Sequence, residues 1–171
     1  MYTSIGNTTG TFRARLLSEL KKEWINGINK SNIAVIDNYE EIYNNLLYSH
    51  LFVDELFIYL LSSEYSKTIL ISIKFPLIYP FRPPKIKINS QYDYFNLCGS
   101  IPTNMVKEKF GLDCVCCNSM LCNWGPTRTL NSLMEECLER LELKLRSNNI
   151  NFVKLCVIKK FGHYLPISEF L

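Results

Sequence analysis

Apolar residues near the start of the chain recur at intervals of three and four, which is the period of a helix with one buried face. The members of this stripe are Phe12, Leu16, Leu17, Leu20 and Trp24. Thr11 stands directly before the stripe, and threonine is a residue type that caps helix N-termini. We therefore expect a helix from residue 12 onward, after a flexible leader over residues 1–10 that is rich in Ser, Thr, Asn and Gly.

The next part of the chain shifts to runs of β-branched and aromatic residues, which are typical of strands. We expect strands at residues 57–61, 68–75 and 85–88, and a further short strand at 32–36. Turn residues between the first two make them an antiparallel pair, and the short connections predict a meander. A short helix over residues 39–47 fits ahead of them, because its apolar positions have helical spacing.

The last third of the chain carries the cleanest helical stripe, which follows the capping residue Thr129. Its members are Leu130, Leu133, Met134, Cys137, Leu138, Leu141 and Leu145. The polar triplet at 147–149 predicts the end of this helix, and a last helix is expected from Phe152 to Gly162. Together the elements predict an α+β fold with an N-terminal helix, an antiparallel meander of three or four strands and a crossover helix.

Residues 89–128, which lie before that helix, show no sustained periodicity. A connection of this length inside a compact domain is usually functional. Cysteines 98, 114, 116, 117 and 122 all lie in it. Because disulfides are disfavoured inside cells, these thiols indicate a reactive thiol, a metal site or both. Cys137 and Cys156 fall on helical apolar stripes instead, so we expect both to be buried.

The composition is that of a globular protein, with 47% apolar and 20% charged residues among 171. We expect one domain over residues 11–171. No apolar run reaches the length of about eighteen residues that a membrane span needs, and the N-terminus lacks a signal-peptide pattern. The net charge of +3 comes without a basic block, which argues against a nucleic-acid partner. These features predict an intracellular protein, cytoplasmic or nuclear (in the host cell if its source is viral), with no membrane partner.

Two motifs flank the cysteine-rich connection. Residues Tyr79–Pro84 read Tyr-Pro-Phe-Arg-Pro-Pro, and residues Trp124–Pro126 read Trp-Gly-Pro. With the order of helix, meander, long connection and helix, they resemble the ubiquitin-conjugating enzymes. That family's Tyr-Pro-Phe-x-Pro-Pro pattern is matched in full, and its Trp-Ser-Pro pattern is matched with glycine in place of serine. The resemblance covers about residues 11–146 and implies the ubiquitin-conjugating fold.

The resemblance also implies positions for the reactive groups. The family's nucleophilic cysteine lies eight residues before the tryptophan, which is Cys116 here, with Cys117 as a rival. The family's His-Pro-Asn ends twelve residues after the second proline, which gives Asn96 without the His-Pro. Asn104 is a second candidate for this asparagine. An insertion at about residues 97–113 separates Asn96 from the cysteine.

The family carries ubiquitin or a ubiquitin-like protein as a cysteine thioester and passes it to a lysine or to a ligase. The attacking species is the thiolate. Aminolysis creates an oxyanion, and losing one side-chain donor aimed at such an oxyanion typically costs about 10²–10³ in rate. Asn96 would hold that role, and Asn118 is close enough to Cys116 in sequence to reach the same region. The chemistry requires no cofactor.

The resemblance implies partner surfaces as well. Phe81 and Pro126 would lie in two loops that meet at one end of the domain and receive the ligase. The first helix carries a basic face, whose residues are Arg13, Arg15, Lys21 and Lys22. This face is either solvated or a docking surface, for which the resemblance implies the activating enzyme.

Two alternatives stay open. Cys98, Cys114, Cys122 and either Cys116 or Cys117 offer four thiolates, which is enough for a tetrahedral structural zinc. If zinc used both Cys116 and Cys117, the domain would be inactive. The second alternative is a catalytically inactive relative that keeps the fold and acts as a binding protein, which the missing His-Pro and the insertion favour.

Overall fold

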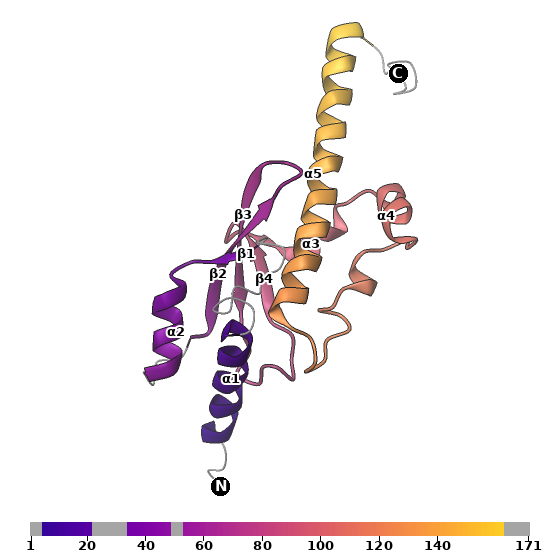
Figure 1. The fold of residues 1–171 in the computed structure, drawn as a ribbon. Helices are drawn as coiled ribbons and strands as arrows, with labels where there is room; N and C mark the ends of the chain where they lie inside the picture. The colour runs from indigo at the N-terminus through magenta and orange to yellow at the C-terminus, as the bar shows by residue number, and fades with distance from the viewer. Residues whose placement is uncertain (1–4, 22–33, 49–52, 163–171) are drawn as a thin grey trace.

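The computed structural model of the chain describes residues 5–21, 34–48 and 53–162 and shows an α+β architecture (Figure 1). Its strands form one antiparallel sheet in the order of the sequence. They are β1 (Ala34–Ile36), β2 (Glu55–Ser62), β3 (Lys67–Lys74), β4 (Lys85–Ile88) and β5 (Tyr92–Asp93). The meander was predicted with three or four strands; β5, a two-residue strand, is the one that the sequence did not indicate.

One face of the sheet is covered and the other is open. Along β2, Ile58 and Leu60 are fully buried, whereas Phe57 and Leu61 on the opposite face are 38% exposed. Antiparallel pairing with β3 places Ile58 opposite Ile71. The alternation fixes the register, because a shift by one residue would turn the buried side chains to solvent.

Two helices lie near the start of the chain: one precedes β1, and the other connects β1 to β2. These are α1 (Ile5–Leu20) and α2 (Tyr39–Tyr48). The predicted leader is wrong in part, because residues 5–10 belong to α1 and Thr11 lies inside this helix instead of capping it. Trp24 and residues 32–33 lie outside the described residues.

A single helix, α5 (Leu130–Phe161), follows the cysteine-rich connection. Thr129 caps it as predicted, because its hydroxyl oxygen accepts the backbone N–H of Ser132 at 3.2 Å. The predicted break at 147–149 is wrong: the helix continues through it and ends at Gly162, which has the left-handed conformation expected there. Ser147 is only 2% exposed, so tertiary packing overrides its weak helix propensity.

The C-terminal half of α5 extends beyond the sheet (Figure 1). Phe152 and Leu155, which continue the spacing of the buried stripe, are 67% and 65% exposed. Cys156 is exposed too, so its predicted burial is wrong, whereas Cys137 is fully buried as expected. No helix in the described part of the chain combines the length and the apolar character that crossing a membrane requires.

The connection between β5 and α5 is not a plain loop. It contains α3 (Tyr94–Gly99), α4 (Thr103–Phe110) and the short 3₁₀ helix η2 (Cys116–Asn118). Asp93 caps α3 by accepting the backbone N–H of Asn96, and Gly111 ends α4 in the left-handed conformation. The expected insertion at 97–113 therefore comprises the end of α3 and the whole of α4.

Glu19 of α1 is a buried carboxylate that joins three segments. It accepts the backbone N–H of Leu130 at 2.8 Å and the Tyr79 hydroxyl at 3.0 Å, and it pairs with Arg15. The N–H of Leu130 is one of the donors that a helix leaves unsatisfied at its N-terminus, where the helix dipole favours negative charge. Glu19 therefore stabilises the start of α5 from a neighbouring helix.

Candidate active site

The cysteine loop, which we define as residues 114–118, lies between α4 and α5 and is anchored on both sides. Val115 is 4% exposed, and Ser119, which directly follows the loop, is fully buried. Cys114, which directly precedes Val115, and Cys117 are exposed, and Cys116 is half-buried. The backbone is thus held inside the protein while the thiols face outward.

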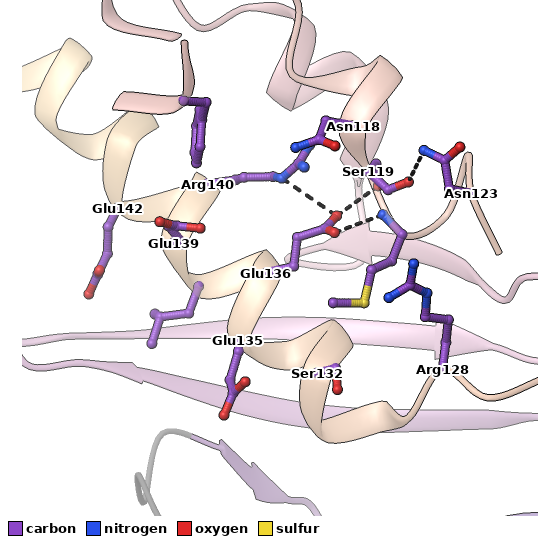
Figure 2. Close-up of a pocket in the computed structure, with 13 residues that line it drawn as sticks. Asn118, Ser119, Asn123, Arg128, Ser132, Glu135, Glu136, Glu139, Arg140 and Glu142 are labelled. Atoms are coloured by element: carbon purple, nitrogen blue, oxygen red, sulfur yellow. Dashed lines mark hydrogen bonds and ion pairs between the residues drawn. The ribbon is translucent and has the colours of Figure 1, made fainter. Parts of the chain in front are cut away.

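A buried ion pair on α5 holds these anchors in place. Glu136 and Arg140 lie one turn apart, with Oε1 and Nε separated by 3.5 Å and both side chains less than a tenth exposed. Arg140 donates to the carbonyl oxygen of Val115, and Glu136 accepts the Ser119 hydroxyl and the Met120 backbone N–H, each at 2.7 Å (Figure 2). We call this arrangement the Glu136–Arg140 clamp.

The clamp provides most of the hydrogen-bond partners that two buried charges require. A buried ion pair is costly unless further hydrogen bonds complete it. The backbone and hydroxyl partners from the cysteine loop and the residues after it supply these bonds, and the Phe110 ring lies 5.9 Å from the guanidinium carbon. Neither Glu136 nor Arg140 was singled out from the sequence. The available signal was a pair of opposite charges at i and i+4 on the half of α5 that carries the buried stripe.

The three thiols of the cysteine loop interact with one another. The sulfur atoms of Cys114, Cys116 and Cys117 all lie within 4.8 Å of one another, and those of Cys116 and Cys117 are 3.9 Å apart. A hydrogen bond from the Cys116 thiol, helped by backbone N–H groups, lowers the pKa of Cys114 to about 7. Donating that bond raises the pKa of Cys116 to about 11, so Cys114 ionises first.

The structure does not assemble the predicted four-thiolate zinc site. Cys98 is 1% exposed on α3, where burial raises the pKa of its thiol to about 11. Within the described residues, the sulfur group comprises Cys114, Cys116 and Cys117, without Cys98 or Cys122. Cys98 differs from the loop thiols because its side chain is buried in the core on α3, and sequence spacing carries no information about burial.

An open pocket of about 740 Å³ lies beside the cysteine loop, between α5 and the residues that follow η2 (Figure 2). Asn118 and Asn123 line it from one side, and Glu135 and Glu139 line it from α5. Asn123 also donates to the carbonyl oxygen of Cys117 at 3.0 Å, which fixes the backbone of the cysteine loop. The predicted active-site neighbour Asn118 therefore lines this pocket.

The asparagines predicted further upstream lie on two other helices, α3 and α4, of which α3 contacts η2. Asn96 is exposed on α3, and its backbone N–H bonds to Asp93. Asn104 is exposed on α4 and lines a separate hollow with Arg146 and Lys154. Among the described residues, no hydrogen bond joins either asparagine to the cysteine loop; Asn118 belongs to the loop itself, and Asn123 bonds to it through the carbonyl oxygen of Cys117.

The two sequence motifs meet in space. The indole N–H of Trp124 donates to the carbonyl oxygen of Pro80 at 2.7 Å, and the Trp124 ring lies 5.9 Å from that of Tyr79. Beside this junction Phe81 is 65% exposed, and Pro126 is exposed as well. The two residues predicted to bind a ligase are thus carried by loops that contact each other.

The predicted basic face of α1 is largely used for internal contacts. Arg13 donates to the carbonyl oxygen of Leu46 in α2, and Arg15 pairs with Glu19 and donates to the carbonyl oxygen of Arg128. Lys21 is exposed, and Lys22 lies outside the described residues. The two arginines therefore hold α1 against its neighbours.

A scan of the sequence against models of known protein families finds no match, and a search of curated proteins finds no similar chain.

Proposed function

We propose that the protein is a ubiquitin-conjugating enzyme in which a thiol of the cysteine loop carries ubiquitin or a ubiquitin-like protein as a thioester. The observation that carries the proposal is the position of accessible thiols on an anchored loop just before Trp124, whose indole is bonded to the Tyr79–Pro84 turn. The order of helix, antiparallel sheet and long helix is compatible with the fold of that family.

The reaction has two balanced steps. In the first, the cysteine sulfur attacks the carbonyl carbon of an acyl group held as a thioester by an activating enzyme; a new S–C bond forms, and the activating enzyme's sulfur leaves as a thiolate. In the second, a lysine amine attacks the same carbon, loses its proton to solvent and releases the cysteine. Cys116 is the proposed nucleophile by its position, with Cys117 as the rival. Asn96 is the proposed donor to the oxyanion of the second step, with Asn118, which lines the adjacent pocket, as the alternative.

The proposed partner surfaces consist of side chains that are exposed in the structure. Phe81 and Pro126 form the proposed ligase contact, since an exposed aromatic side chain beside an exposed proline is suited to apolar recognition. Of the basic residues on α1, Lys21 remains available for the activating enzyme, whereas Arg13 and Arg15 are used internally.

The test is a charging assay with activating enzyme, ubiquitin and ATP, run on paired reducing and non-reducing gels. We expect an adduct that a thiol reductant removes and that Cys116→Ser converts into an ester resistant to reduction. Cys156→Ser is the matched control, because Cys156 is exposed on α5 and outside the sulfur group. Absence of any adduct with ubiquitin and with a ubiquitin-like protein, while the activating enzyme of each is charged, would contradict the proposal and favour the alternative of an inactive relative that acts as a binding protein.

A further inference from the structure

The proposed transfer needs one sulfur, yet the cysteine loop presents three. Cys114, Cys116 and Cys117 bring their sulfur atoms within 4.8 Å of one another, and no two of them form a disulfide. Acyl transfer takes place on one sulfur, and two further thiols beside it expose the loop to oxidation. The grouping therefore calls for a second chemical explanation.

We propose that Cys114, Cys116 and Cys117 together bind one thiophilic d¹⁰ metal ion, Zn²⁺ or Cu⁺, through their three sulfur atoms. This ligand set differs from the four-cysteine zinc site expected from sequence spacing, because it omits both Cys98 and Cys122. It also uses no ligand outside the cysteine loop.

The sulfur geometry suits a single shared ion. A metal–sulfur bond of about 2.3 Å places two sulfur ligands about 3.8 Å apart at a tetrahedral angle and about 4.0 Å apart at a trigonal angle. The separation of 3.9 Å between Cys116 and Cys117 falls between these values. Every pair in the group lies within 4.8 Å, so the remaining sulfur separations exceed the ideal spacing by at most about 1 Å.

The backbone that carries these thiols is already ordered. Arg140 bonds to the carbonyl oxygen of Val115, the N–H of Ser119 bonds to that of Cys116 at 3.1 Å, and Asn123 bonds to that of Cys117 at 3.0 Å. A ligand set on a fixed backbone loses little conformational entropy when the ion binds. Cys114 and Cys117 are exposed, so the ion reaches the site directly from solvent.

The donor type selects the metal. Three soft thiolates with no carboxylate or imidazole in the group disfavour Mg²⁺ and Ca²⁺ and favour Zn²⁺ or Cu⁺. Three sulfurs complete a trigonal shell around Cu⁺. Around Zn²⁺ they leave a fourth position, which a water molecule occupies in open zinc sites.

Ion binding and acyl transfer use the same sulfur of Cys116. A sulfur bonded to a metal shares its negative charge with the ion and is a weaker nucleophile than the free thiolate, so we expect a bound ion to slow charging. This consequence rests on the proposed function, whereas the binding site itself does not.

The test uses the full-length protein, reduced and freed of metal by a chelator under anaerobic conditions. Zn²⁺ and Cu⁺ are titrated separately, with native mass spectrometry for stoichiometry and thiolate-to-metal absorption for the ligands; Co²⁺ replaces Zn²⁺ for the optical readout. We expect one ion per chain and at least a tenfold loss of affinity in Cys114→Ser, Cys116→Ser and Cys117→Ser. Cys156→Ser should bind as the unaltered protein does, and circular dichroism verifies that each variant is folded.

The outcomes separate the two proposals. Binding of either ion with the expected variant pattern supports the site and identifies the metal. Failure of both ions, or binding that survives the loss of all three cysteines, overturns it. Charging is measured on the metal-free protein. A protein that forms the thioester but binds no ion refutes only the metal site, and one that binds the ion but forms no thioester when metal-free refutes only the transfer.

Discussion

At the scale of single residues, Glu136 determines how firmly the cysteine loop is attached to α5. Replacing it with alanine leaves Arg140 charged, buried and without its counterion, and breaking such a pair costs about 3–5 kcal/mol. We expect Glu136→Ala to lower the free energy of unfolding by this amount in urea denaturation. Glu135→Ala is the matched control, because Glu135 is exposed and should change stability by less than about 0.5 kcal/mol. Equal effects of the two substitutions would contradict the clamp.

Thiol reactivity divides the seven cysteines by burial. Cys98 and Cys137 are at most 1% exposed, and burial raises the pKa of both thiols, so they stay protonated and shielded at pH 8. In the metal-free native protein we expect iodoacetamide to modify the four exposed thiols first, Cys116 more slowly because its pKa is also raised, and Cys98 and Cys137 only after denaturant is added. Peptide mass spectrometry reads the pattern. Rapid modification of Cys98 in the native state would show that α3 does not bury it as described.

At the scale of elements, Gly111 controls the end of α4. Its φ of +68° lies in the left-handed region, which costs other residues about 1–2 kcal/mol. Because no atom would crowd an added Cβ, Gly111→Ala should lower stability by that backbone cost alone. Gly99→Ala, in an equally open position without positive φ, should be close to neutral in the same thermal or urea unfolding series. A neutral Gly111→Ala would argue against this helix end.

The elements with long periodic patterns were predictable, and the others were not. The strands at 57–61 and 85–88 and the start of α5 at Thr129 could be derived because side-chain alternation and capping are local properties. Helix α4 escaped notice because eight residues are too few to show a stripe, although Pro102 and Gly111 bound it. The polar triplet at 147–149 suggested a helix end, yet Ser147 is buried in a hollow that Met105 of α4 also lines. Local propensity cannot anticipate such packing.

In the candidate site too, some features could be predicted from the sequence and others could not. The grouping of Cys114, Cys116 and Cys117 follows from their closeness in sequence, because four consecutive positions on a tight turn keep their side chains together. The exclusion of Cys98 and the role of Glu136 depend on how α3 and α5 pack, which no spacing along the chain encodes.

At the scale of the whole molecule, α5 consists of a packed part and an exposed part. Leu133, Met134 and Cys137 are fully buried, whereas Phe152 and Leu155 are largely exposed. Amide protection follows local burial and contact density. In native-state hydrogen exchange we expect amides at 134–147 to be protected far more strongly than those at 152–161. Uniform protection along the helix would show that a second surface, from this chain or another copy, covers the exposed part.

The exposed part of α5 depends on the packed part for its conformation. Starting a helix is unfavourable, with a nucleation constant of about 10⁻³, while adding a residue to an existing helix is nearly neutral. Residues 130–147 are held by the core and supply the nucleus, so residues 148–161 elongate a helix that already exists. A peptide of the same fourteen residues, shorter than the roughly 15 needed in water, would be mostly coil on its own. The helical conformation of residues 148–161 therefore depends on the buried turns at residues 130–147, although the core does not cover the exposed end of α5.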